Sequence, residues 1–103
     1  MGGFTTDRLH TELWTSWASM LRVYGAAHGM NSLHHAVVEV GADEIVFRVD
    51  TRWMRFTGDE MVGSGGEEAA FELKEDGTVR IGDVTDEMDM AAERVAREML
   101  HSK

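Results

Sequence analysis

The sequence predicts an α+β fold in the order helix, four-stranded antiparallel meander, helix (α-β-β-β-β-α), with the first helix packed on one face of the sheet. Apolar residues recur at helical spacing near both ends of the chain and alternate with polar residues between them. Glycine-containing turns separate the alternating stretches, as in β-hairpins. The 103 residues suffice for one hydrophobic core, so we expect a single domain over residues 1–103.

The first element is a helix expected over residues 6–28. At helical spacing its apolar side chains gather in one broad arc with Trp14 at the edge, and polar side chains fill the opposite side. Thr5 or Thr6 can cap the first turn, and Asp7 suits the positive end of the helix dipole. One face of this helix is therefore expected to be buried. That face contains Leu9, Leu13, Trp17, Met20, Leu21, Tyr24 and Ala27.

The first two strands are expected on either side of a turn at residues 41–44. This turn gives one coherent apolar face, because side chains in a strand alternate between the two faces of the sheet. The expected pairs are Ala36 with Val49, Val38 with Phe47 and Val40 with Ile45. Trp53 and Phe56 would point to opposite faces of a regular strand, so we expect the second strand to bend or bulge after Thr51.

The other two strands are expected in the stretch "FELKEDGTVRI". A two-residue turn would place its apolar residues on different faces, whereas a three-residue loop that ends at Gly77 forms one face. Gly77 would then have a left-handed backbone, which glycine adopts at little cost. We therefore expect the three-residue loop, with Leu73 opposite Val79 and Phe71 opposite Ile81.

The remaining two segments are a connection and a second helix. Residues 58–68 are rich in glycine and acidic residues, and we expect them to form a flexible connection between the two hairpins. The second helix is expected over residues 86–101, with Thr85 as its N-cap and acidic residues in its first turn. Its inward stripe consists of Met88, Ala92, Val95 and Met99.

Composition limits the classes of partner and the cellular location. The net charge is −9 and most of the excess acid follows Gly58, so neither nucleic acid nor an anionic membrane is expected as a partner. No apolar run reaches the roughly 18 residues of a membrane span, and no secretory signal is visible. Cysteine is absent, which excludes disulfides and thiolate nucleophiles. The expected location is the cytoplasm.

The histidines do not predict a metal site. His10 and His28 share one side of the first helix but lie about 27 Å apart at roughly 1.5 Å per residue. His34 and His35 are neighbours on a strand and point to opposite faces. His101 falls in the tail of the chain. We therefore expect no bound metal, and no motif indicates a cofactor.

One candidate site lies on the sheet face away from the apolar pairs. His35 is expected opposite Asp50, and a carboxylate beside an imidazole fixes its tautomer, as it does for general bases. Arg48 and Arg52 are expected on the same face, where they could hold a carboxylate or phosphate. We favour the alternative that this face is solvated and charge-balanced, with Glu39 neutralising Arg48.

A second candidate site is a pocket between the first helix and the sheet. Aromatic side chains at helical spacing are usually core residues, but the chain also has eight methionines, which suit adaptable pockets and interfaces. The pocket would take a small apolar or anionic ligand. The ligand-binding residues expected there and on the adjoining face are Trp17, Tyr24, Arg48, Arg52, Trp53 and Met54.

No catalytic or nucleotide motif stands in the sequence, and enzymatic activity is not the favoured interpretation. More apolar surface is predicted than one layer covers, so we expect a non-enzymatic binding or interaction domain that acts as a homodimer. Two alternatives stay open. One is a cofactor-free small-molecule-binding protein or small enzyme that uses His35 and Asp50, and the other is an acidic protein that neutralises a basic partner.

Overall fold

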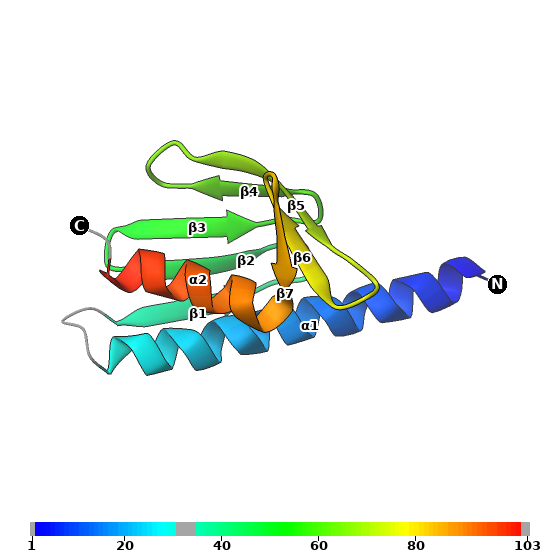
Figure 1. Cartoon of the computed structure of the whole chain (residues 1–103), viewed down its shortest axis with the longest axis horizontal. Coiled ribbons are helices and arrows are strands. Elements are labelled where there is room, and N and C mark those ends of the chain that lie inside the picture. The colour runs from blue at the N-terminus through cyan, green and yellow to red at the C-terminus, as the bar shows by residue number, and fades with distance from the viewer. Residues whose placement is uncertain (1, 31–34, 102–103) are drawn as a thin grey trace.

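The computed structural model describes residues 2–30 and 35–101, which form two helices and seven strands (Figure 1). The α+β class and the order helix, sheet, helix are confirmed, but the sheet has seven strands rather than the four predicted. The elements are α1 (Gly2–Gly29), β1 (Ala36–Val40), β2 (Ile45–Val49), β3 (Arg52–Phe56), β4 (Glu60–Gly63), β5 (Glu68–Leu73), β6 (Thr78–Ile81), β7 (Val84–Glu87) and α2 (Met88–His101).

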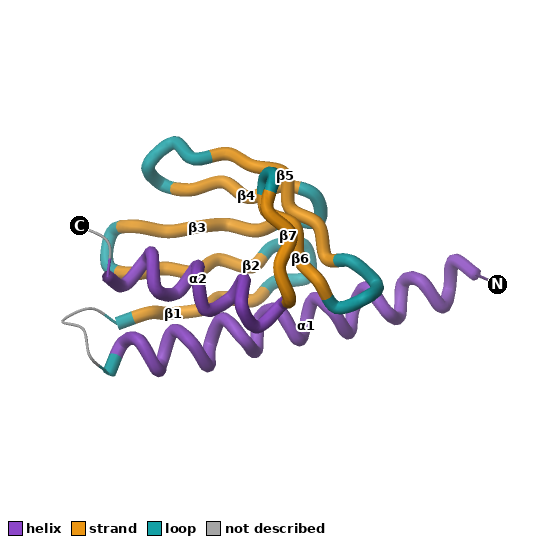
Figure 2. The backbone as a smooth tube through the Cα atoms, in the orientation of Figure 1, coloured by secondary structure: helices purple, strands orange, loops and turns teal. Residues whose placement is uncertain are grey.

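The seven strands form one antiparallel meander in which each strand pairs with the next along the chain (Figure 2). Strands β1 to β4 lie nearly side by side, β5 begins beside β4 and then bends away, and β6 and β7 cross at a steep angle to the first strands (Figure 1). Both helices lie along the same face of the sheet and pack against each other. We call this the inner face, and the opposite face the outer face.

Both predicted hairpin registers are confirmed. Around the turn at residues 41–44, Ala36 pairs with Val49 and Val40 with Ile45. Leu73 pairs with Val79 in the second hairpin. Register is strongly specified in both hairpins because a slip of one residue would move every apolar side chain to the outer face.

The three-residue loop of the second hairpin is also confirmed. Gly77 has a φ of 89°, and its amide donates to the carbonyl of Lys74. The Asp76 carboxylate accepts hydrogen bonds from the hydroxyl and the amide of Thr78, at 2.6 and 3.0 Å. These hydrogen bonds lower the pKa of Asp76, because they favour its charged form. The loop therefore has both the backbone and the side-chain contacts that stabilise a tight turn.

The hydrophobic core lies between the inner face and the two helices, with an aromatic cluster at its centre. The ring of Trp17 meets Phe56 edge-on with centroids 5.3 Å apart, and Phe71 lies 5.0 Å from Phe56. All three side chains are at most 2% exposed. Burying each contributes about 1.5–3 kcal/mol relative to exposure, so the cluster is a main source of stability. Trp14 is also buried rather than at an edge, and Ala27 is exposed.

The three additional strands occupy segments that lack clean alternation. Strand β3 follows a two-residue turn, and β4 lies within residues 58–68, which were predicted to be a flexible connection. That prediction is wrong because Met61 pairs with Phe56 and is buried. Strands of four or five residues with at most one buried side chain show little periodicity in their sequence.

The start of the second helix also differs from the prediction. Residues 84–87 pair with β6 as β7, and α2 begins at Met88. Thr85 therefore lies in a strand and not at an N-cap, although the predicted inward stripe is buried as expected. Asp86 faces α2 and forms an ion pair of 2.5 Å with Arg94. Within the described residues, neither helix has the length and hydropathy needed to cross a bilayer.

Candidate functional site

A two-residue turn divides the stretch "RVDTRWMRFTG" into two strands. β2 ends at Val49 and β3 begins at Arg52, and these two residues pair across the turn. Asp50, the first residue of the turn, has a φ of 56°, which Asp adopts more readily than most residues. The bend predicted after Thr51 is therefore a complete reversal of the chain.

This reversal separates two arginines that were predicted to share a face. Arg48 pairs with Trp53 on the outer face, whereas Arg52 is on the inner face. There the Arg52 guanidinium donates a hydrogen bond to the backbone carbonyl of Met99 in the last turn of α2. The carboxyl end of a helix carries partial negative charge, so the contact is also electrostatically favourable. The prediction that Arg48 and Arg52 share a face, where both could hold one anion, is therefore wrong.

The predicted His35–Asp50 pair lies just beyond the β1–β2 ladder. The last pair of that ladder is Ala36 with Val49, and Asp50 belongs to the β2–β3 turn. His35 is exposed and lines a hollow of about 340 Å³ beside the end of α1, where Gly25 is another lining residue. Asp50 is not among the described residues that line this hollow. The structure thus places His35 beside the end of α1, one residue beyond the last pair of the ladder.

The four side chains predicted as pocket walls do not share a space. Trp17 is fully buried in the core, and Tyr24 and Met54 are half-buried against it. Trp53 lies on the outer face, because adjacent residues of a strand point to opposite faces. The pocket predicted between these four residues is therefore not formed.

The outer face of β1 to β4 instead brings apolar and cationic side chains together. The Arg55 guanidinium lies 5.7 Å from the centre of the half-buried Trp53 ring, within the range of a cation–π contact. Arg55 pairs with Val46 on one side and with Val62 on the other. Val37, which pairs with Arg48 on β1, is 53% exposed. We call this surface the outer patch; its members are Val37, Val46, Arg48, Trp53, Arg55 and Val62.

Both arginines of the outer patch have acidic partners in the chain. Arg48 lies 2.9 Å from Glu39, which confirms the predicted neutralisation, and Arg55 lies 3.9 Å from Glu44. These side chains are between 42% and 51% exposed, and exposed ion pairs contribute at most about 1 kcal/mol. Another carboxylate could therefore replace either partner at small cost.

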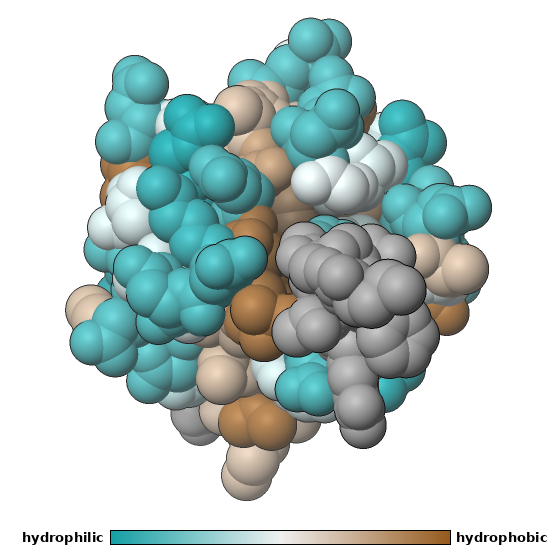
Figure 3. Space-filling model, turned by 90° about the vertical axis from the view of Figure 1, so that its right-hand side faces the viewer, coloured by the Kyte–Doolittle hydropathy of each residue, from teal (hydrophilic) through white to brown (hydrophobic). Residues whose placement is uncertain are grey.

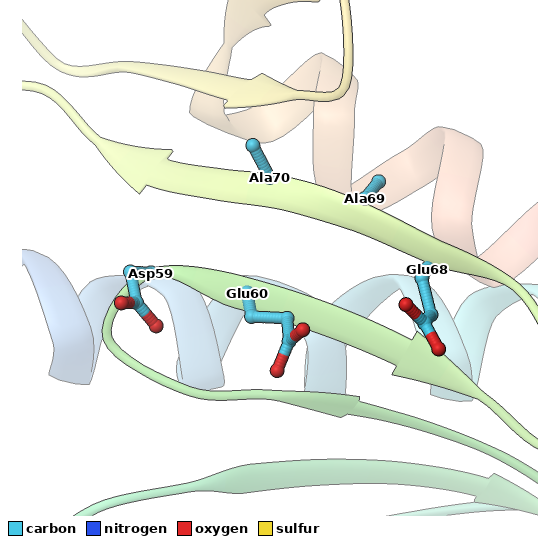
Figure 4. Close-up of a pocket in the computed structure, with 5 residues that line it drawn as sticks. All are labelled: Asp59, Glu60, Glu68, Ala69 and Ala70. Carbon is cyan, nitrogen blue, oxygen red and sulfur yellow. The ribbon is translucent and has the colours of Figure 1, made fainter.

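The adjoining part of the outer face is acidic. Glu60 of β4 and Glu68 of β5 line a shallow hollow of about 430 Å³ together with Asp59, Ala69 and Ala70 (Figure 4). The three carboxylates point away from the two alanines in this view (Figure 4). Glu68 pairs directly with Val62 of the outer patch. The outer face thus changes from charge-balanced, with its arginines on β2 and β3, to acidic towards β5.

A histidine cluster links the ends of the two helices. His28 Nε2 lies 3.0 Å from Glu93 Oε2, and His28 Nδ1 lies 3.0 Å from His101 Nε2. The two partners contact opposite nitrogens of one imidazole, so one metal ion could not reach all three side chains without a rearrangement. No group of three potential metal ligands is arranged for binding among the described residues. His10, near the other end of α1, stacks on Trp14.

We compared the chain with known protein families, curated proteins and solved structures. No family model, curated protein or solved structure matches this chain. Its function must therefore be inferred from its own surfaces.

Four members of the outer patch, Val37, Val46, Arg55 and Val62, were not predicted as site residues. A signal for Arg55 exists in the sequence: two turn-forming residues, Asp50 and Thr51, stand between stretches that can each alternate. If residues 52–56 are taken as a separate strand, Trp53 and Arg55 share one face. That face is the one that carries Arg48.

Proposed function

We propose that the protein is a non-enzymatic interaction domain that acts as a homodimer, with the outer patches of two copies packed against each other. The observation that carries this proposal is the apolar centre of the outer patch, where Val46, Trp53 and Val62 lie on a face that no described element covers. When one face of an antiparallel sheet is solvated, its side chains are usually polar. An apolar centre therefore favours a partner.

The distribution of charge on the outer face favours a second copy as that partner. Arginines lie on β2 and β3, while Glu60 and Glu68 lie on β4 and β5. A two-fold axis parallel to the strands and between β3 and β4 would set the arginines of each copy opposite Glu60 and Glu68 of the other. Such complementarity fixes the orientation of the two copies.

The size of the face limits the affinity. Four strands about 4.8 Å apart, each with four or five residues at about 3.4 Å, give a projected area of roughly 300 Å². A standard interface buries about 800 Å² per partner, so this one is small. We therefore expect a dissociation constant in the micromolar range, which corresponds to about −8 kcal/mol.

The alternative of a small enzyme or small-molecule-binding protein has less support in the geometry. A ligand pocket would need the predicted walls to meet, and Trp53 lies on the opposite face of the sheet from the buried Trp17. We also propose that the domain is located in the cytoplasm.

Sedimentation equilibrium from low micromolar to millimolar concentration tests the dimer. We expect a reversible monomer–dimer equilibrium that Val62→Glu abolishes, because the new carboxylate would be buried at the centre of the interface. Val84→Glu adds the same charge to a valine that is 45% exposed on β7, outside the outer patch, and should leave the equilibrium unchanged. A wild-type chain that is monomeric throughout, or equal effects of the two variants, would contradict the proposal.

A further inference from the structure

A second surface lies at the other side of the molecule, between α1 and the β5–β6 hairpin. Leu9, His10 and Leu13 of α1 line a hollow of about 520 Å³ together with residues 72–76 of the hairpin. Figure 3 views the molecule from this end, and a strip of hydrophobic surface is visible there beside hydrophilic side chains. We call this hollow the leucine groove.

The floor of the leucine groove is apolar and is supported by the core. Leu13 and Leu73 are half-buried and pack against the buried cluster, and Leu9 is half-buried one helical turn before Leu13. Leucines at this spacing lie on one side of a helix. The floor therefore offers a row of aliphatic contacts held by rigid elements.

The rim of the leucine groove is acidic. Its lining includes three acidic residues, Glu72, Glu75 and Asp76, and one lysine, Lys74. Glu72 is 3.4 Å from Arg80, whereas Glu75 lies at the exposed tip of the hairpin. Asp76 is held in its charged form by its hydrogen bonds to Thr78. The wall that faces an occupant of the groove is therefore negatively charged.

A smaller hollow continues on the far side of His10. It measures about 370 Å³, and its lining includes Trp14, Ala42 and Asp43 as well as His10. Trp14 donates a hydrogen bond of 3.3 Å to the carbonyl of Gly41, which holds the indole against the β1–β2 turn. The apolar surface and the acidic rim thus extend around two sides of α1.

We propose that the leucine groove binds a basic amphipathic helical segment of a partner protein. Apolar side chains at i, i+3, i+4 and i+7 of that segment would contact the leucines, and lysines or arginines beside them would meet Glu75 and Asp76. The acidic rim disfavours nucleic acid and anionic lipid, which would otherwise suit an apolar or extended groove. The leucine groove is separate from the outer patch, so this inference does not depend on the homodimer.

A labelled synthetic peptide tests the proposal by fluorescence anisotropy. The probe is an amphipathic peptide with leucines at these spacings and lysines on its polar face, and the comparison peptides are a scrambled version and one with glutamate in place of lysine. We expect saturable binding of the first peptide only, weakened by added salt. Binding of all three peptides alike, or of none, would overturn the proposal.

Variants of the protein locate the binding. Glu75→Lys reverses a rim charge and should weaken binding of the basic peptide about tenfold, in the range measured for complementary charged contacts. Leu9→Ala removes part of the apolar floor and should also weaken binding. Glu98→Lys makes the same charge change at an exposed position of α2 and should leave the affinity unchanged. The Val62→Glu variant, monomeric by design, should bind the peptide as the wild type does. Equal weakening by Glu75→Lys and Glu98→Lys would show general charge attraction and would refute a site in the groove.

Discussion

Val49 and Arg52 face each other across a two-residue turn, and this pairing decides which side of the sheet each of their neighbours occupies. It brings Arg48 and Trp53 together on the outer face and places Arg52 on the inner face, where it contacts the carbonyl of Met99. The two arginines closest to the turn therefore have different physical roles. One lies in a proposed interface, and the other joins the sheet to the end of α2.

Replacing these two arginines should have unequal effects on stability. Arg52→Met keeps the length of the side chain but removes the donor to Met99, and we expect the free energy of unfolding to fall by about 1.5–3 kcal/mol, as for hydrogen bonds to charged groups. Arg48→Met removes an exposed ion pair with Glu39 and should cost less than about 1 kcal/mol. Urea denaturation measures both, and equal losses would contradict the assignment of faces.

A glycine comparison tests the loop of the second hairpin. Gly77→Ala forces a residue with a side chain into a φ of 89°, and we expect a loss of about 1–2 kcal/mol in unfolding free energy. Gly58→Ala is the matched control, because a Cβ added there meets nothing within 4 Å. Thermal melting of both variants should separate them clearly. A Gly77→Ala protein as stable as Gly58→Ala would mean that this loop adopts a different turn.

The pKa of Asp76 should depend on Thr78. The hydroxyl of Thr78 is the main cause of the lowered pKa, so Thr78→Val should raise the pKa of Asp76 towards its ordinary value, while the amide of residue 78 still donates. A carboxyl pKa that is lower in the folded state stabilises the fold above the unfolded-state pKa. This contribution disappears as the pH falls through the folded-state pKa. Carbon-detected NMR titration measures the change, with Thr85→Val as control. An unchanged pKa of Asp76 would contradict the assigned contact.

The parts of the fold that could be predicted from the sequence are those in which buried residues recur at a regular spacing. Both hairpin registers could be derived because, of the registers compared, only one in each hairpin sets all the apolar side chains of one face opposite each other. Strand β7 could not, since Thr85 and Asp86 have the composition of a helix start, and only pairing with β6 makes them a strand. Tertiary contacts override local propensity in such short segments.

The candidate site could be predicted only in part, because the turn at Asp50 and Thr51 decides which face of the sheet its residues occupy. Arg48 and Trp53 were recognised as site residues, but without the reversal at Asp50 they could not be placed opposite each other, and Arg52 was assigned to the wrong face. The leucine groove was not recognised at all. It brings Leu9 of α1 next to Leu73 of β5, two residues far apart in the sequence.

Oxidative cross-linking of single-cysteine variants tests the proposed homodimer most directly, because the natural chain has no cysteine. Val62 lies beside the proposed two-fold axis, so Val62→Cys should form a disulfide-linked dimer readily at concentrations near the dissociation constant. Val23→Cys, at a position on α1 that is 63% exposed, should stay largely monomeric under the same conditions. A Val62→Cys chain that cross-links no faster than Val23→Cys would contradict the packing of two outer patches.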